Sequence, residues 1–135
     1  MTAELTAFLE ARLDERESAA VAAGGRGEGW QALGTGVYSV PVDEDAPPLV
    51  TTGPEVGGTD EDAARAEHVA LHDPTRVLRE VEAARRVLRA HEQWCEGRCE
   101  AKHPEGGFDA AHYWSVKSLA AVYADHPDHR EEWRP

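Results

Sequence analysis

Hydrophobic residues recur at helical spacing between His72 and Trp94, in the segment HDPTRVLREVEAARRVLRAHEQW. Successive apolar positions are separated by four, three and four residues, which places them on one face of an α-helix. These positions are Val77, Val81, Ala84 and Leu88. Asp73 is a favourable N-cap, and Pro74 suits the first helical position, where no backbone N–H is required. The pattern predicts a central amphipathic helix over residues 74–94.

Three more segments show helical patterns. Residues 3–22 form the first, with Leu5, Phe8, Leu9 and Leu13 on the expected buried side. Residues 60–71 form the second, and Thr59 with Asp62 matches a capping box at its start. Residues 109–124 form the third, in which Asp109 can act as the cap and the apolar face is broad. That face comprises Ala110, Tyr113, Trp114, Val116, Leu119, Ala120 and Tyr123.

The spacing of the hydrophobic residues changes between Trp30 and Thr52. The segment GVYSVPV alternates in the manner of a strand, DEDAPP is typical of a polar turn, and LVTT is a plausible returning strand. Pro41 restricts the first strand to an edge or to an end nearby. We expect a two-stranded β-ribbon within 30–52 that packs on the helices, because such a ribbon is only marginally stable alone.

These elements predict a mainly helical α+β fold with three to four helices and the small ribbon. The length of 135 residues suits a single domain, 1–135. The expected core residues are Leu5, Phe8, Leu9, Val77, Val81, Leu88, Trp114, Leu119 and Tyr123. Residues 125–135 form a polar tail, in which His126 and His129 are expected to be solvated. The tail ends close to Trp133, which either pins the terminus to the body or contacts a partner.

The net charge of −12 is unevenly distributed along the chain. Residues 1–73 carry 15 acidic and 4 basic side chains, whereas residues 74–135 carry 11 and 10. Basic side chains concentrate on the central helix, where the acidic N-terminal half can neutralise them. Nucleic-acid binding is therefore disfavoured, since it usually requires a basic face. An acidic surface that keeps the protein soluble is the simplest interpretation, and mimicry of DNA toward a basic protein is the alternative.

The localisation expected from the sequence is cytoplasmic. No apolar run approaches the roughly 20 residues that a membrane span requires, and the acidic N-terminus is not typical of a secretory signal. Cys95 and Cys99 are accordingly expected to be reduced.

One group of residues has the composition of a metal site. His91, Cys95, Cys99 and His103 follow one another at intervals of four residues, and zinc prefers four thiolate and imidazole ligands. The chain would have to turn after Lys102 for His103 to complete the site, and His112 could substitute for it. The competing interpretation is a core cysteine, a histidine at a helix end and two surface residues. His68 and His72 also lie four residues apart but lack the glutamate of a metalloprotease motif.

Catalytic templates are not matched. No serine occupies a nucleophile elbow, and no oxyanion site accompanies the cysteine and histidine residues. We therefore expect no catalytic residues and no cofactor, with zinc as the alternative. The leading hypothesis is a small acidic accessory protein that interacts with a protein partner. A zinc-stabilised binding module and a DNA mimic are the competing hypotheses.

Three stretches resemble a known family. They are FLEARLDERESAA at 8–20, AEHVALHDPTRVLREVEAARRVLRAH at 66–91 and LAAVYADHPDHREEWRP at 119–135. Together with Trp30, they resemble an uncharacterised family of actinobacteria and their phages, domain of unknown function 6221. The resemblance implies family membership and carries no activity, fold or site to this chain.

Overall fold

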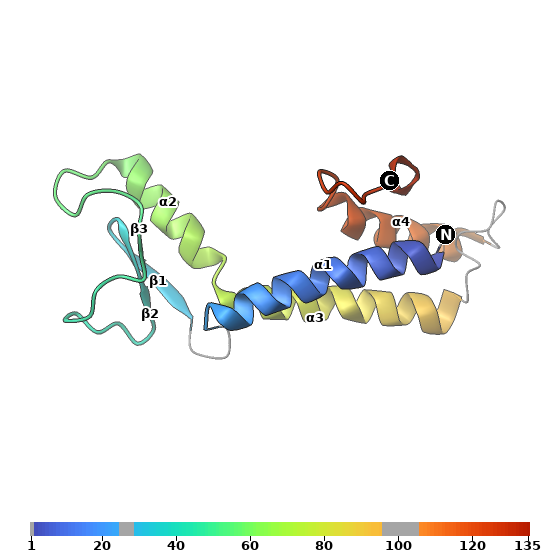
Figure 1. The fold of residues 1–135 in the computed structure, drawn as a ribbon, viewed down its shortest axis with the longest axis horizontal. Helices are drawn as coiled ribbons and strands as arrows, with labels where there is room; N and C mark the ends of the chain where they lie inside the picture. Colours follow the sequence, from blue (N-terminus) through green and yellow to red (C-terminus); the bar gives the residue numbers. More distant parts are fainter. Residues whose placement is uncertain (1, 25–28, 96–105) are drawn as a thin grey trace. The chain divides into compact units, whose positions relative to one another are not determined.

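The computed structural model describes residues 2–24, 29–95 and 106–135 (Figure 1). These residues contain four α-helices and a three-stranded antiparallel sheet, so the fold is mainly helical α+β as predicted. The chain divides into two compact units. Unit 1 comprises Met1–Glu15 and Val81–Pro135, and unit 2 comprises Arg16–Glu80. That both units make up one domain stays a prediction.

Unit 2 contains the sheet, in which β1 (Trp30–Leu33), β2 (Gly36–Ser39) and β3 (Val50–Thr51) are neighbours in that order. The helix α2 (Asp60–Leu71) packs on the sheet, and its Ala66 and Ala70 form a small core with Val37 of β2. Asp73, between α2 and α3 (Pro74–Ala90), caps α3 by accepting a hydrogen bond from the Arg76 backbone N–H at 2.7 Å. Its second oxygen accepts from the Trp30 N–H at 3.2 Å, which ties the start of the sheet to the helix.

Unit 1 is built from the first part of α1 (Thr2–Ala22), the part of α3 from Val81 onward, and α4 (Gly106–Ala121). Its buried residues lie on the expected helix faces: Leu5, Phe8, Leu9, Leu13, Val81, Leu88, Val116 and Ala120. After α4 the chain turns back onto the beginning of α1 (Figure 1) and forms a short 3₁₀ helix, η3 (Glu131–Trp133). Trp133 is buried there, so it pins the terminus.

The ribbon prediction was incomplete because β1 was missed. The segment WQAL lacks β-branched residues and gives little strand signal by itself. It becomes a strand because Gly34 and Thr35 form a two-residue hairpin turn, in which Gly34 has φ +59°. The pairing joins Trp30 to Ser39 and Leu33 to Gly36.

Trp114 was wrongly assigned to the core, since it is 55% exposed. The helix α4 buries Val116 and Ala120, which lie four residues apart on one face. Two residues correspond to about 200° around a helix, so Trp114 points away from the face that Val116 occupies. Val77, Leu119 and Tyr123 are partly buried, and the remaining predicted core residues are buried.

The central and last helices differ from their predicted bounds. The regular helix α3 ends at Ala90, and residues His91–Cys95 continue as a π-helical turn, η1. The helix α4 begins and ends three residues earlier than the predicted 109–124. No helix within the described ranges is long and apolar enough to span a lipid bilayer.

Candidate functional site

The predicted metal ligands are only partly within the described residues. His91 begins η1 and is 1% exposed. The Cys95 side chain, Cys99 and His103 lie outside the described residues. His112 of α4 stacks on His91, with the ring centroids 5.1 Å apart and the planes inclined by 13°. The described residues contain no group of three or more His, Cys, Asp or Glu side chains that could hold a metal ion.

His68 and His72 lie together at the end of α2, as their spacing suggests. Their ring centroids are 4.6 Å apart, and both residues are exposed. The pair provides two imidazoles and belongs to no larger group of metal-ligating side chains in the described part of the chain.

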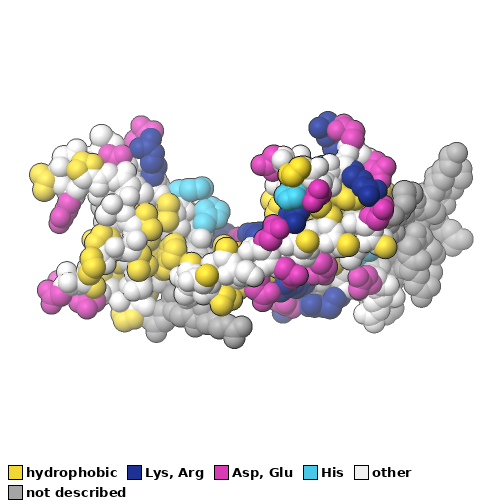
Figure 2. Space-filling view, viewed as in Figure 1, with side chains coloured by type: hydrophobic (Ala, Val, Ile, Leu, Met, Phe, Trp, Pro, Cys, Tyr) yellow, Lys and Arg dark blue, Asp and Glu magenta, His cyan; other side chains and the backbone are white. Residues whose placement is uncertain are grey.

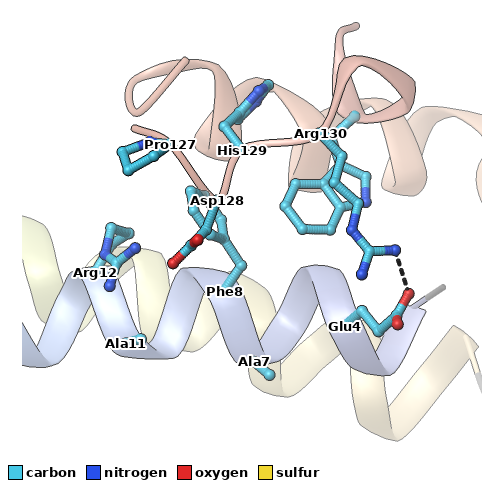
Figure 3. A pocket seen from close by; sticks show the side chains of 10 residues that line it. Glu4, Ala7, Phe8, Ala11, Arg12, Pro127, Asp128, His129 and Arg130 are labelled. Atoms are coloured by element: carbon cyan, nitrogen blue, oxygen red, sulfur yellow. Dashed lines mark hydrogen bonds and ion pairs between the residues drawn. The ribbon is translucent and has the colours of Figure 1, made fainter. Parts of the chain in front are cut away.

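A groove of about 620 Å³ lies in unit 1, between the beginning of α1 and the C-terminal segment (Figure 3). Phe8 packs beneath it with its ring centroid 5.1 Å from that of Trp133. His126 and His129 also contact Phe8, edge to face, at 5.6 and 5.8 Å. The prediction that both histidines are solvated was therefore wrong, because the C-terminal segment folds back onto α1.

Charged groups line this groove. Arg130 donates to the Glu4 carboxylate at 2.6 Å, and this hydrogen bond lowers the pKa of Glu4 and raises that of Arg130. Arg12 is 9% exposed and donates to Glu15 and His126. The basic groups that line the groove are thus engaged with residues of the protein, and this arrangement favours attachment of the tail over binding of a charged ligand.

Most of the described carboxylates in unit 1 are paired with arginines. Arg85 lies 2.7 Å from Asp14 and 3.7 Å from Glu10, as expected if α1 neutralises the central helix. Glu82 pairs with Arg86 and Arg89, and the hydrogen bond from Arg89 is the main cause of its lowered pKa. Other pairs in this unit are Glu4–Arg130, Glu15–Arg12 and Glu131–Arg134.

Unit 2 differs, because six of its exposed carboxylates have no cationic partner in the described residues. They are Asp43, Glu44, Asp45, Glu55, Asp60 and Glu67. The same unit carries seven of the nine exposed large hydrophobic residues found in the described chain: Val21, Leu33, Val40, Leu49, Val50, Val56 and Leu71. Figure 2 shows apolar side chains and carboxylates side by side over the strands and loops of this unit.

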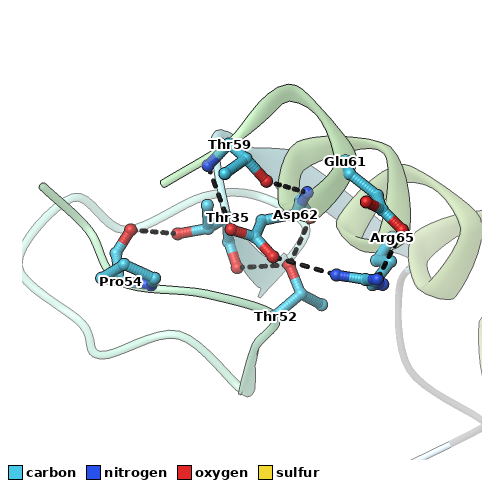
Figure 4. A network of polar contacts seen from close by, with 7 residues as sticks. All are labelled: Thr35, Thr52, Pro54, Thr59, Glu61, Asp62 and Arg65. Atoms are coloured by element: carbon cyan, nitrogen blue, oxygen red, sulfur yellow. Dashed lines mark hydrogen bonds and ion pairs between the residues drawn. The ribbon is translucent and has the colours of Figure 1, made fainter. Parts of the chain in front are cut away.

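The loop from Thr52 to Thr59 is tied to its neighbours by a network of hydrogen bonds (Figure 4). The Thr52 hydroxyl donates to the Asp62 carbonyl oxygen at 2.6 Å, and the Thr52 N–H donates to the Thr35 carbonyl oxygen at 2.9 Å. The Thr35 hydroxyl donates to the Pro54 carbonyl oxygen at 3.3 Å. These bonds connect the loop to the β1–β2 turn on one side and to α2 on the other.

The capping box of α2 completes the network, as the sequence predicts. The Thr59 hydroxyl accepts from the Asp62 N–H at 3.1 Å, and the Thr59 N–H donates to the Asp62 carboxylate at 3.0 Å. This last bond is the largest contribution to the lowered pKa of Asp62. Arg65 donates to Asp62 and to Glu61 at 3.0 and 2.6 Å.

Sequence reasoning identified the capping box but not the exposed loop as a site. Glycine and proline in GPEVGG, residues 53–58, indicate a loop. Val56 is the one branched apolar residue of this segment, and it is 90% exposed. The feature that could have indicated this site in the sequence is a valine within a segment composed mainly of residues that favour turns.

A model of the family of unknown function DUF6221 matches residues 2–135. No curated protein and no solved structure matches the chain. Because the family model spans almost the whole sequence, this chain belongs to the DUF6221 family of unknown function.

Proposed function

We propose that this protein is a small, acidic, cytoplasmic interaction protein that binds a basic protein partner through unit 2 and catalyses no reaction. The observation that carries the proposal is the coincidence of unpaired carboxylates and exposed apolar side chains in that unit. Ordinary solubilising charge does not require apolar neighbours, whereas protein interfaces combine an apolar centre with a polar rim.

The charge of unit 2 also indicates that the partner is basic. In the described part of unit 1 most carboxylates pair with arginines, so their charges are largely neutralised locally. The exposed carboxylates of unit 2 that have no cationic partner in the described residues remain available, and they attract Lys and Arg of a partner and accelerate its association.

The test uses a synthetic peptide of leucine and lysine, about four helical turns long, with leucines on one face. We expect the full chain to bind it, measured by fluorescence anisotropy, and to bind neither a scrambled peptide of the same composition nor a leucine–glutamate counterpart.

The Glu55→Lys/Glu67→Lys variant should bind several-fold more weakly than wild type. Glu92→Lys/Asp125→Lys is the matched control, because both residues are exposed carboxylates of unit 1 without an ion pair in the described chain. Equal loss in the two variants, or no binding to wild type, would contradict the proposal.

The DNA-mimic version of this hypothesis predicts a different result. A mimic is recognised through charge alone, so the scrambled peptide would bind as well as the amphipathic one and duplex DNA would compete for either. We favour the interaction protein because the exposed apolar side chains have no role in mimicry of phosphates.

A zinc-stabilised module is the second candidate, and the observation in its favour is the stacking of His112 on His91. The pair supplies two imidazoles next to the turn that contains Cys95. Metal content by elemental analysis, together with melting curves with and without a chelator, tests this candidate. About one zinc per chain and a lower melting temperature with chelator would support it, and a metal-free protein with an unchanged melt would exclude it.

A further inference from the structure

The loop between β3 and α2 is held close to its neighbours at both ends. A Cβ atom added at Gly53 would lie 2.6 Å from Cγ of Asp62. One added at Gly58 would lie 2.7 Å from Cγ2 of Thr35 and 2.8 Å from the carbonyl oxygen of Pro54. A larger residue would require the Asp62 side chain to move at position 53 and the Thr35 side chain or the loop backbone to move at position 58. Gly57, with φ +85°, directs the chain back toward α2.

Val56 lies at the middle of this constrained loop and is 90% exposed. A single exposed apolar residue is ordinary on a protein surface. Val56 differs in being displayed by a backbone that hydrogen bonds and close glycine contacts hold on both sides. The side chain itself adds almost nothing to the core of unit 2. Leu33 and Val50, which lie on strands paired to the same end of β2, are 47% and 40% exposed.

We infer that the loop of residues 52–59 is the recognition element of unit 2, with Val56 as the apolar anchor for a basic amphipathic helix of the partner. This inference rests on the proposed interaction function and specifies the element that performs it. Glu55, next to the anchor in the sequence, and Asp60, at the start of α2, are exposed and have no cationic partner in the described residues, so they supply negative charge for the Lys and Arg side chains that border the apolar face of such a helix.

The exposed position of Val56 and the negative charge near it favour a basic amphipathic helix as the partner. A side chain displayed by a loop requires a hollow on the partner, and the apolar face of a helix offers one between residues spaced three and four apart. An acidic partner helix is disfavoured by the carboxylates on both sides of Val56. Because the loop is already ordered by Thr35, Thr52 and Asp62, binding loses little conformational entropy there.

Anisotropy titrations of the full chain with the amphipathic leucine–lysine peptide test this inference. We expect Val56→Ser to weaken binding about tenfold, as for a central anchor residue. Val122→Ser is the matched control, since Val122 is also an exposed valine, 70% exposed, and lies in unit 1. This control should bind within twofold of wild type.

The outcomes separate this inference from the proposed function. Loss in Val56→Ser alone supports the loop as the recognition element. If wild type binds the peptide but Val56→Ser binds equally well, the loop inference is wrong while the interaction function survives. If wild type does not bind the amphipathic peptide, both are wrong. Circular dichroism of Val56→Ser verifies its fold, which we expect to be unchanged because the wild-type side chain is almost fully exposed.

Discussion

Arg12 donates a hydrogen bond from Nη1 to the ring of His126, with 2.7 Å between Nη1 and Nε2. Arginine has no acceptor, so the imidazole supplies the lone pair. This bond links α1 to the C-terminal segment 114 positions later in the chain. Arg12 therefore holds the tail directly.

Removal of the acceptor on His126 should loosen the tail. His126→Leu deprives Arg12 of that acceptor, whereas the amide oxygen of His126→Gln can still accept from Arg12. We expect the indole N–H signal of Trp133 in NMR spectra to shift in His126→Leu and to stay close to its wild-type position in His126→Gln. Equal shifts in the two variants would exclude this bond as the origin.

Trp133 and Trp114 should differ strongly in their contributions to stability. Trp133 is 4% exposed and packs on Phe8, so Trp133→Ala should cost about 3–5 kcal/mol. Trp114→Ala should cost less than about 1 kcal/mol because that side chain is 55% exposed. Urea unfolding of the two variants measures both values. Similar losses would mean that the tail is not docked as described.

Asp62 should make the stability of unit 2 depend on pH. Its pKa lies below the ordinary value of 3.8, mainly because it accepts from the Thr59 backbone N–H. A lowered folded-state pKa adds stability that is complete above the unfolded-state value and is lost as the pH falls through the folded-state value. Asp62→Asn should therefore be less stable than wild type at pH 7, and the difference should shrink in acid. Chemical denaturation at a series of pH values checks this, and a difference that stays constant would contradict it.

Thr52→Val should destabilise unit 2 by about 1–2 kcal/mol, because it removes the hydroxyl that donates to the Asp62 carbonyl oxygen. Thr35→Val removes a longer and more exposed bond to Pro54 and should cost less. Melting temperatures rank the two variants. Hydrogen exchange would show where each variant is destabilised, since only Thr52→Val should increase amide exchange at the start of α2.

Local pattern was sufficient for the helices and the capping box. The spacing of Leu5, Phe8 and Leu9 defines a buried face, and the Thr59–Asp62 pair defines a helix start, because both depend on neighbours within one turn. Strand β1 could not be predicted in this way. Its segment has weak strand propensity and is extended because β2 pairs with it.

The candidate surface of unit 2 could not be predicted from the sequence for a related reason. Eight acidic residues between Val40 and Ala70 are visible in the sequence, but which of them remain unpaired depends on where the arginines lie in space. The tail shows the same limit, since its polar composition predicts solvated histidines. Only the return of the chain onto α1 brings His126 to Arg12 and buries Trp133 against Phe8.

The period of each helix, the family and the sign of the charge follow from residue type and short spacing, so they can be predicted from the sequence. Folding specifies which charges are neutralised, which tryptophan is buried and which valine is displayed. Those outcomes depend on contacts between residues far apart in the chain, and no local pattern specifies such contacts.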